Sequence, residues 1–180
     1  MIEKKGQRIG CGHKPLAQWC SAMQIMLVAW VIMLLSTPVA GQEVAVEADT
    51  VIAYACSHLG APYRYGGKSP KGFDCAGFTR YVFLKYGLEL AASAGGQYRQ
   101  CEHVADTAVQ PGDLVFYGGR GGGEAIGHVG LVTEVDSTGF RFIHAASDGV
   151  RYTRSTEPYY RKRYKGIGRP IHYKENGSND

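Results

Sequence analysis

The stretch GFDCAGFTRYVFLKYG, residues 72–87, contains a local pattern that decides how this part of the chain folds. Its apolar residues recur at spacings of three and four, which predicts that they share one face of a helix. The residues with this spacing are Phe78, Tyr81, Val82 and Tyr86. Asp74 is the expected N-cap and Gly87 the expected stop, so Cys75 would be the first residue of the helix.

A thiol at the start of a helix has two explanations. Cysteine is often buried as a small apolar residue, and this structural role is the commoner one. A helix N-terminus also carries roughly half a positive charge on its unpaired N–H groups, which favours the thiolate over the thiol. In that case Cys75 would be a nucleophile, and the sequence should also supply a base.

The histidines offer candidates for that base. A nucleophilic cysteine needs a base within hydrogen-bond reach and usually a third group that orients it. His58 and His103 are predicted to lie on helices, at the surface or at a helix end, and His172 lies near the C-terminus. His128 opens a predicted strand and His144 lies on the next strand across a hairpin. Because side chains on adjacent antiparallel strands are about 5 Å apart, one ring could take the thiol proton while the other fixes its tautomer.

The predicted elements run from helices to strands. Helices are expected over residues 45–59 and from residue 75 to about 86, with a weaker helical pattern over 92–104 because glycines interrupt it. After the turn at 111–112, strands are predicted at DLVFY (113–117), HVGLVTEV (128–135), FRFIHAA (140–146), VRYTRS (150–155) and residues 167–171. Residues 136–139 form a hairpin connection. Helices followed by strands, without βαβ alternation, predict an α+β fold with an antiparallel sheet.

The first 41 residues have the pattern of a secretory signal. Four basic residues precede an apolar stretch at 25–35, which is followed by STPVAGQ (36–42). The apolar stretch is shorter than the roughly 20 residues needed to cross a bilayer, although the long basic leader leaves an uncleaved anchor as the alternative. Cleavage after Gly41 would leave residues 42–180 as a single domain in the periplasm, at the cell wall or outside the cell.

Charge and cysteine content limit the possible partners. Removal of residues 1–41 takes away four basic residues and one acidic residue, which lowers the formal net charge from +4 to about +1 and weakens the case for nucleic-acid binding. Seven basic residues and one acidic residue between 151 and 169 form either a solvated face or a surface that attracts an anionic polymer such as a cell wall.

The exported chain would keep three cysteines, so at least one thiol is free in an oxidising compartment. Cys56 and Cys101 could form a disulfide, or both could be buried free thiols. The cysteine and histidine spacings do not form a metal-ligand set, and no metal or other cofactor is expected. GGRGGGEAIG (118–127) lacks the Lys-Ser/Thr pair of a phosphate-binding loop and is predicted to be a mobile loop at the rim of a site.

Four motifs, in this order, resemble the NlpC-type papain-like cysteine peptidases of bacterial cell walls: GAPYRYGGKSPKGFDCAGF (60–78), PGDLVFY (111–117), GHVGLV (127–132) and FIHAA (142–146). The resemblance covers residues 50–170. It implies a papain-like α+β fold in which N-terminal helices, including the cysteine helix, pack on an antiparallel sheet. It also implies cleavage of the amide between the side-chain carboxyl of D-glutamate and the diamino acid of peptidoglycan stem peptides.

The resemblance assigns roles residue by residue. Cys75 matches the family nucleophile, His128 the base and His144 the polar residue that orients the base. Tyr63 matches a tyrosine whose hydroxyl lies near the nucleophile and supports the oxyanion. Asp74 matches a residue that helps to shape substrate binding.

Two positions depart from the family pattern. Ala76 stands where a serine is frequent, a change between small residues that we expect to be tolerated. In LAASAGGQ (90–97), Ala92 stands where arginine is common, and Ser93 stands where some members place an aspartate that helps to bind the free amine of an N-terminal alanine. Ser93 remains a substrate-binding candidate, but a requirement for that free amine loses support.

The sequence therefore predicts a secreted, monomeric cysteine endopeptidase that hydrolyses the γ-D-glutamyl–diamino acid bond. Its expected partners are peptidoglycan stem peptides, with no nucleic acid and no stable membrane insertion after cleavage. The alternatives are an amidase or acyltransferase that uses the same Cys–His pair, and a catalytically silent module that binds the cell wall. Binding alone needs no thiol beside a base, which argues against the silent module. The preferred diamino acid does not follow from the sequence.

Overall fold

The computed structural model describes residues 47–119 and 123–170, which fall within one compact unit, Val44–Asp180. The predicted leader at 1–41 and His172 lie outside the described residues, so cleavage after Gly41 stays a prediction. Within the two described ranges, no helix is both long enough and apolar enough to cross a membrane.

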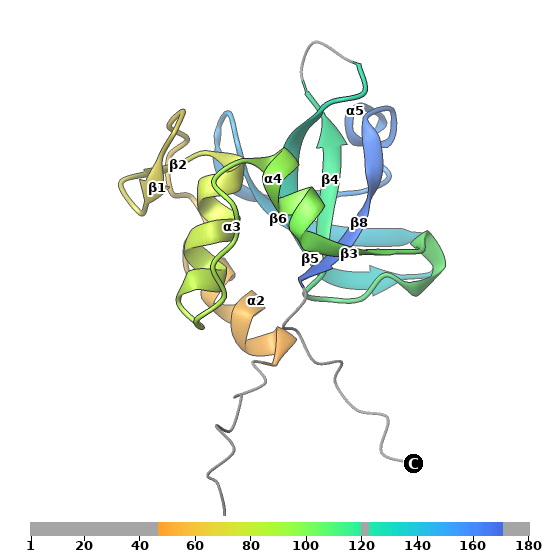
Figure 1. Cartoon of the computed structure of the whole chain (residues 1–180), viewed down its shortest axis with the longest axis horizontal. Helices are drawn as coiled ribbons and strands as arrows, with labels where there is room; N and C mark the ends of the chain where they lie inside the picture. The colour runs from red at the N-terminus through yellow and green to blue at the C-terminus, as the bar shows by residue number, and fades with distance from the viewer. Residues whose placement is uncertain (1–46, 120–122, 171–180) are drawn as a thin grey trace, which may run out of the picture. The chain divides into compact units, whose positions relative to one another are not determined.

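The chain forms short helices and one large sheet (Figure 1). The helices are α2 (Ala48–Cys56), α3 (Cys75–Leu84), α4 (Ala94–Gln100), the 3₁₀ turn η1 (Asp106–Ala108) and α5 (Pro158–Arg161). A small hairpin pairs β1 (Lys68–Ser69) with β2 (Gly72–Phe73). The six-stranded sheet runs in the order β3 (Cys101–Val104), β8 (Tyr164–Pro170), β4 (Leu114–Gly118), β5 (Ile126–Asp136), β6 (Gly139–Ala146) and β7 (Gly149–Arg154). All neighbouring strands are antiparallel, which confirms the predicted α+β class.

Three local predictions are wrong. The pattern over 92–104 is helical only to Gln100, and the following residues form strand β3, so His103 lies on a strand. This strand exists because it pairs with β8 from the far end of the chain, a partner that no local pattern reveals. Helix α5 lies in a region that was predicted to be entirely strand. The helix predicted over 45–59 ends at Cys56, so His58 lies two residues beyond it and not on the helix.

The start of α3 follows the expected capping chemistry. The Oδ1 atom of Asp74 accepts a hydrogen bond from the N–H of Gly77 at 2.6 Å, as an N-cap should. Its Oδ2 atom accepts from the N–H of Gly66 at 2.9 Å, which ties the preceding loop to the helix start. The helix ends at Leu84, and Gly87 adopts a φ of +83° in the turn beyond it. This turn is a Schellman motif, the ending that a glycine at this place favours.

Packing against the sheet fixes the direction of α3. Phe78, Val82 and Phe83 are buried, and the helix contacts β5 and β6 (Figure 1). The backbone of the preceding loop also approaches closely, because a Cβ atom added at Gly77 would lie 2.0 Å from the carbonyl oxygen of Gly67. These contacts hold the first turn of α3 at the edge of the strands that carry the two central histidines.

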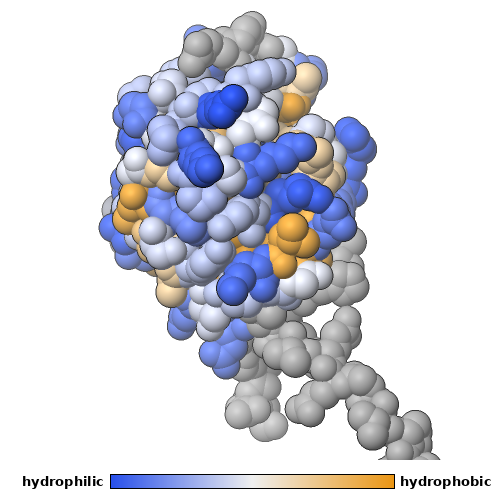
Figure 2. Space-filling model, turned by 90° about the vertical axis from the view of Figure 1, so that its left-hand side faces the viewer, coloured by the Kyte–Doolittle hydropathy of each residue, from blue (hydrophilic) through white to orange (hydrophobic). Residues whose placement is uncertain are grey.

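The face shown in Figure 2 is largely hydrophilic, with hydrophobic residues in small separate areas. The large exposed apolar side chains come from different parts of the chain: Leu59, Tyr63, Tyr65, Leu84, Val135 and Tyr159. Of these, Tyr63, Tyr65 and Tyr159 line a pocket.

Candidate active site

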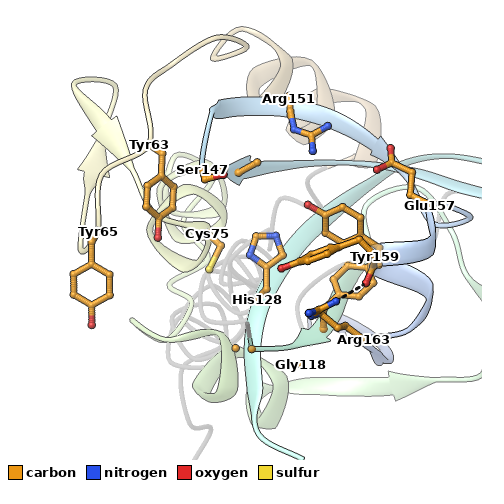
Figure 3. A pocket seen from close by; sticks show the side chains of 16 residues that line it. Tyr63, Tyr65, Cys75, Gly118, His128, Ser147, Arg151, Glu157, Tyr159 and Arg163 are labelled. Atoms are coloured by element: carbon orange, nitrogen blue, oxygen red, sulfur yellow. Dashed lines mark hydrogen bonds between the residues drawn. The ribbon is translucent and has the colours of Figure 1, made fainter. Parts of the chain in front are cut away.

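A pocket of about 640 Å³ contains the thiol of Cys75 (Figure 3). One wall comes from the start of α3 and the loop before it. The facing walls come from the ends of β4 and β6, the start of β5, strand β7 and the region around α5. Gly118, Gly119 and Gly127, from the two ends of the predicted loop at 118–127, also line the pocket, whereas residues 120–122 lie outside the described residues.

His128 and His144 lie in direct contact. The Nε2 atom of His128 is 2.7 Å from the Nδ1 atom of His144, and the two rings are nearly perpendicular. His128 lies at the start of β5 and His144 on β6, so the predicted approach of the two rings across a hairpin is observed. Since Nε2 of His128 is engaged, its Nδ1 atom is left for the pocket, where Figure 3 shows the ring beside Cys75.

The partners of His144 determine which proton each ring carries. His144 is completely buried, and its Nε2 atom lies 3.0 Å from Oγ1 of Thr153 and 3.5 Å from the hydroxyl of Tyr160. If His144 donates its Nε2–H to Thr153, its Nδ1 atom must accept a hydrogen bond from the Nε2–H of His128. His128 then carries a lone pair on Nδ1, the tautomer that a base facing Cys75 requires.

Thr153 and Tyr160 were not identified from the sequence. Thr153 lies on β7, one strand beyond the predicted pair, and Tyr160 lies on the unpredicted helix α5. Neither has a motif of its own. The alternation of β7 does not indicate Thr153 either, because its apolar residues Val150 and Tyr152 lie on the opposite face of the strand.

Burial sets the protonation of the three central groups. It lowers the pKa of His128 to about 4, and together with the neighbouring His128 it lowers the pKa of His144 to about 2. Burial, followed by the charge of Asp74, raises the pKa of the Cys75 thiol, and hydrogen bonding to backbone groups only partly opposes this. Backbone groups at the helix start do lower the thiol pKa, as predicted, but burial and Asp74 outweigh them, so a resting thiolate is not favoured. The resting pair is a neutral thiol beside a neutral imidazole.

The other predicted site residues fall into two groups. Tyr63 lines the pocket, is bridged to Phe73 just before the cysteine helix, and lies on the opposite side of Cys75 from His128 in Figure 3. The carboxylate of Asp74 is used in the helix cap, and neither Asp74 nor Ser93 lines the pocket. Ser93 is exposed and caps α4 by accepting a hydrogen bond from the N–H of Gly96 at 3.2 Å. Roles for these two residues in substrate binding stay predictions.

The cysteines and possible metal ligands were also located. Cys56, Cys75 and Cys101 are all free thiols, so the disulfide alternative is wrong for this structure. Cys56 Sγ lies 2.8 Å from the hydroxyl of Tyr152, and Cys101 is buried, which raises its pKa to about 12. Among the residues that the structure describes, no three His, Cys, Asp or Glu side chains are grouped so that they could hold a metal ion.

Fold and pocket together define the class of protein. A helix-start cysteine packed against an antiparallel sheet that carries an imidazole pair is the papain-like arrangement, and it holds the groups that thiol-based acyl transfer requires. Within that class, the chain belongs to the NlpC/P60 family, whose sequence model matches residues 60–169.

Two curated relatives carry peptidase names. The chain is 39% identical over 119 residues to a probable endopeptidase p60 of Listeria innocua, a match that covers 66% of this chain and 24% of that protein. It is 34% identical over 122 residues to the bifunctional muramidase/DL-endopeptidase CwlT of Bacillus subtilis, with 67% of this chain and 36% of that protein covered. The chain thus matches only about a quarter of the length of the first relative and slightly more than a third of the length of the second.

Solved structures agree with the fold. An NlpC/P60 family protein from Bacillus cereus matches with a TM-score of 0.64 and 29% identity over 71% of this chain and 41% of that one. RipD from Mycobacterium tuberculosis, described as a non-catalytic NlpC/p60 domain protein adapted to peptidoglycan binding, matches with a TM-score of 0.56 and 23% identity. That match covers 69% of this chain and 97% of RipD. The fold is therefore compatible with catalysis and with binding alone, and the pocket residues must distinguish them.

Proposed function

We propose that the protein is an exported cysteine endopeptidase that hydrolyses the amide between the γ-carboxyl of D-glutamate and the diamino acid of peptidoglycan stem peptides. One observation carries the proposal: Cys75 shares a pocket with His128, whose Nε2 atom lies 2.7 Å from a second, buried histidine. A thiol, a base and a group that orients the base are the parts that nucleophilic catalysis needs. The endopeptidase names of the relatives support an amide as the target.

The first step starts from the neutral pair. As Cys75 Sγ attacks the γ-glutamyl carbonyl carbon, the thiol proton passes to Nδ1 of His128, because a base with a pKa of about 4 is unprotonated at neutral pH. The carbonyl oxygen becomes an oxyanion. In this proposal, backbone N–H groups at the start of α3 and the hydroxyl of Tyr63, which lines the same pocket, stabilise it.

The second step uses the proton now held by His128. The imidazolium donates from Nδ1 to the nitrogen of the diamino acid, the C–N bond breaks, and the amine leaves. Its Nε2–H meanwhile donates to Nδ1 of His144, and this hydrogen bond becomes stronger when the ring is charged. Water then attacks the thioester with His128 as the base, which releases the glutamyl product and restores the thiol.

The leader and the relatives support action outside the cytoplasm. Residues 1–41 are predicted to direct export, and a wall substrate requires it. An amidase or acyltransferase would use the same pair on another amide or with another acceptor. A silent wall-binding module, as RipD is described to be, needs none of the three central side chains.

A defined stem peptide tests the proposal. The purified protein should release the diamino acid from L-alanyl-γ-D-glutamyl-meso-diaminopimelate, followed as the appearance of a new primary amine. Cys75→Ala should release none. Cys56→Ser is the matched control, because Cys56 lies outside the pocket and should leave the rate close to that of wild type. Release that persists in Cys75→Ala, or a wild-type protein that binds the peptide without cleaving it, would contradict the proposal.

A further inference from the structure

The geometry of the site defines where the leaving amine must lie. His128 protonates that amine, so the diamino acid has to lie over His128, on the side away from Tyr63. Figure 3 shows the wall that it would meet there, made by Arg151 on β7, Glu157 and Tyr159 at α5, and Arg163 just before β8. This wall contains most of the charge in the pocket.

Most of the partly buried basic residues between 151 and 169 already have acidic partners. Ion pairs join Arg151 to Asp148, Arg154 to Asp136, Lys165 to Glu124 and Arg169 to Asp113. Arg161 and Lys162 are exposed and do not line the pocket. The cluster is therefore mainly a solvated, internally paired face, and Arg163 is its exception.

Arg163 is held in place but its charge is not neutralised. Its guanidinium lies 3.9 Å from the ring centroid of Tyr159, and its Nη1 donates to the carbonyl oxygen of Tyr159 at 3.3 Å. Among the described residues, no carboxylate lies within 4.0 Å of it, and its buried Nε has no hydrogen-bond partner. Nη2 and the second N–H of Nη1 are therefore available to an anion in the pocket. Arginine is the side chain best suited to bind a carboxylate, and stacking on an aromatic ring fixes it in advance.

We infer that Arg163 binds a carboxylate of the amino acid on the amine side of the scissile bond, an inference that rests on the proposed function. That carboxylate has two possible sources. One is the side-chain carboxylate of meso-diaminopimelate, which lysine lacks, and the other is the α-carboxylate of a stem that ends at the diamino acid. Glu157 supplies a counter-charge for the side-chain ammonium that both diamino acids share. Arg163 is then the residue that distinguishes between stems.

Four substrates separate the two sources. They are L-alanyl-γ-D-glutamyl peptides that end in meso-diaminopimelate or in L-lysine, each with a free or an amidated α-carboxyl. Arg163→Gln should lower kcat/KM by about 10- to 100-fold on substrates that carry the recognised carboxylate, the usual size of a lost hydrogen bond to a charged group. Arg163→Lys should lose less of kcat/KM, because lysine keeps the positive charge although it lacks the planar guanidinium that binds a carboxylate through two hydrogen bonds. Arg161→Gln is the matched control, since its side chain is exposed and outside the pocket.

The pattern of losses decides the outcome. A loss confined to both meso-diaminopimelate substrates assigns Arg163 to the side-chain carboxylate, and a loss confined to both free-acid substrates assigns it to the α-carboxylate. The amidated lysine substrate, which has neither group, should be cleaved equally by wild type and Arg163→Gln, and this also reports correct folding. An equal loss on all four substrates, or no loss on any, overturns the inference.

Binding of free meso-diaminopimelate to Cys75→Ala, measured by calorimetry, separates this inference from the proposed reaction. Adding Arg163→Gln should weaken that binding about 10-fold or more. If wild type cleaved none of the four peptides while this binding still depended on Arg163, the reaction would be wrong and the carboxylate site would stand. If cleavage occurred but neither cleavage nor binding depended on Arg163, only the carboxylate site would be wrong.

Discussion

Replacement of His144 tests the imidazole pair most severely. Its Nδ1 atom lies 2.7 Å from His128, and that contact becomes charge-assisted once His128 has taken the thiol proton. A hydrogen bond to a charged group contributes about 1.5–3 kcal/mol, which corresponds to roughly 10- to 150-fold in rate. His144→Ala also removes the group that selects the tautomer of His128, and orienting groups in comparable triads are worth up to about 10⁴. We therefore expect kcat to fall by about 10²- to 10⁴-fold.

His144→Asn is the informative partner of this variant. The Oδ1 atom of asparagine is the same number of bonds from Cα as the Nδ1 atom of histidine, so it can accept from Nε2–H of His128. We expect this variant to retain at least tenfold more activity than His144→Ala. His128→Asn should be nearly inactive, because an amide cannot accept the thiol proton at neutral pH.

The assay must separate catalysis from stability. His144 is fully buried, so His144→Ala leaves a cavity and unpaired groups on His128 and Thr153, at a cost of roughly 3 kcal/mol in the free energy of unfolding. Rates on the stem peptide should therefore be measured well below the thermal midpoint of each variant. Wild-type kcat in folded His144→Ala would show that His144 is a bystander. A folded His144→Asn as inactive as His144→Ala would show that the accepted hydrogen bond does not matter.

Four further outcomes follow from the structure. Thr153→Val removes the acceptor for the Nε2–H of His144 and should lower kcat about tenfold with little change in KM. An unchanged kcat would show that Thr153 does not select the tautomer of His144. Because burial raises the pKa of the Cys75 thiol and lowers that of His128 to about 4, the ultraviolet difference spectrum between wild type and Cys75→Ala should show no thiolate at neutral pH. For the same reason, kcat/KM should stay constant as the pH falls and drop only near pH 4, where His128 gains a proton. A drop near pH 6.5 would show that burial does not lower the pKa of His128. Gly77→Ala should lower the thermal midpoint, because the added Cβ would lie 2.0 Å from the carbonyl oxygen of Gly67. Alanine is ordinarily the better helix former by about 1 kcal/mol, so without this clash the midpoint would rise. An equal or higher midpoint would refute the close approach.

The start of α3 was predictable because all of its signals are local. Asp74, Cys75 and the apolar spacing lie within three turns, and capping depends on groups only three residues apart. The contact between His128 and His144 was also predictable, because a two-residue hairpin loop leaves consecutive strands no other partner on that side. Short-range geometry therefore accounts for the nucleophile helix and for the imidazole pair.

The remaining features depend on contacts that are distant in the sequence. Strand β3 forms by pairing with β8, and Thr153 reaches His144 only because β7 adds to the other side of β6. The protonation state of Cys75 depends on how deeply α3 packs, which the capping pattern does not reveal. Arg163 was recognised in the sequence only as one charge among several, and its pocket position arises from the turn between α5 and β8.

Digestion of isolated peptidoglycan followed by mass spectrometry of the released muropeptides tests the central claim most directly. Wild-type protein should produce fragments that end in γ-D-glutamate, together with fragments that begin with a free amine on the diamino acid. Neither set should appear with Cys75→Ala. A cut between the sugar lactyl group and L-alanine would identify an amidase instead, and fragments that persist with Cys75→Ala would show that Cys75 is not the nucleophile.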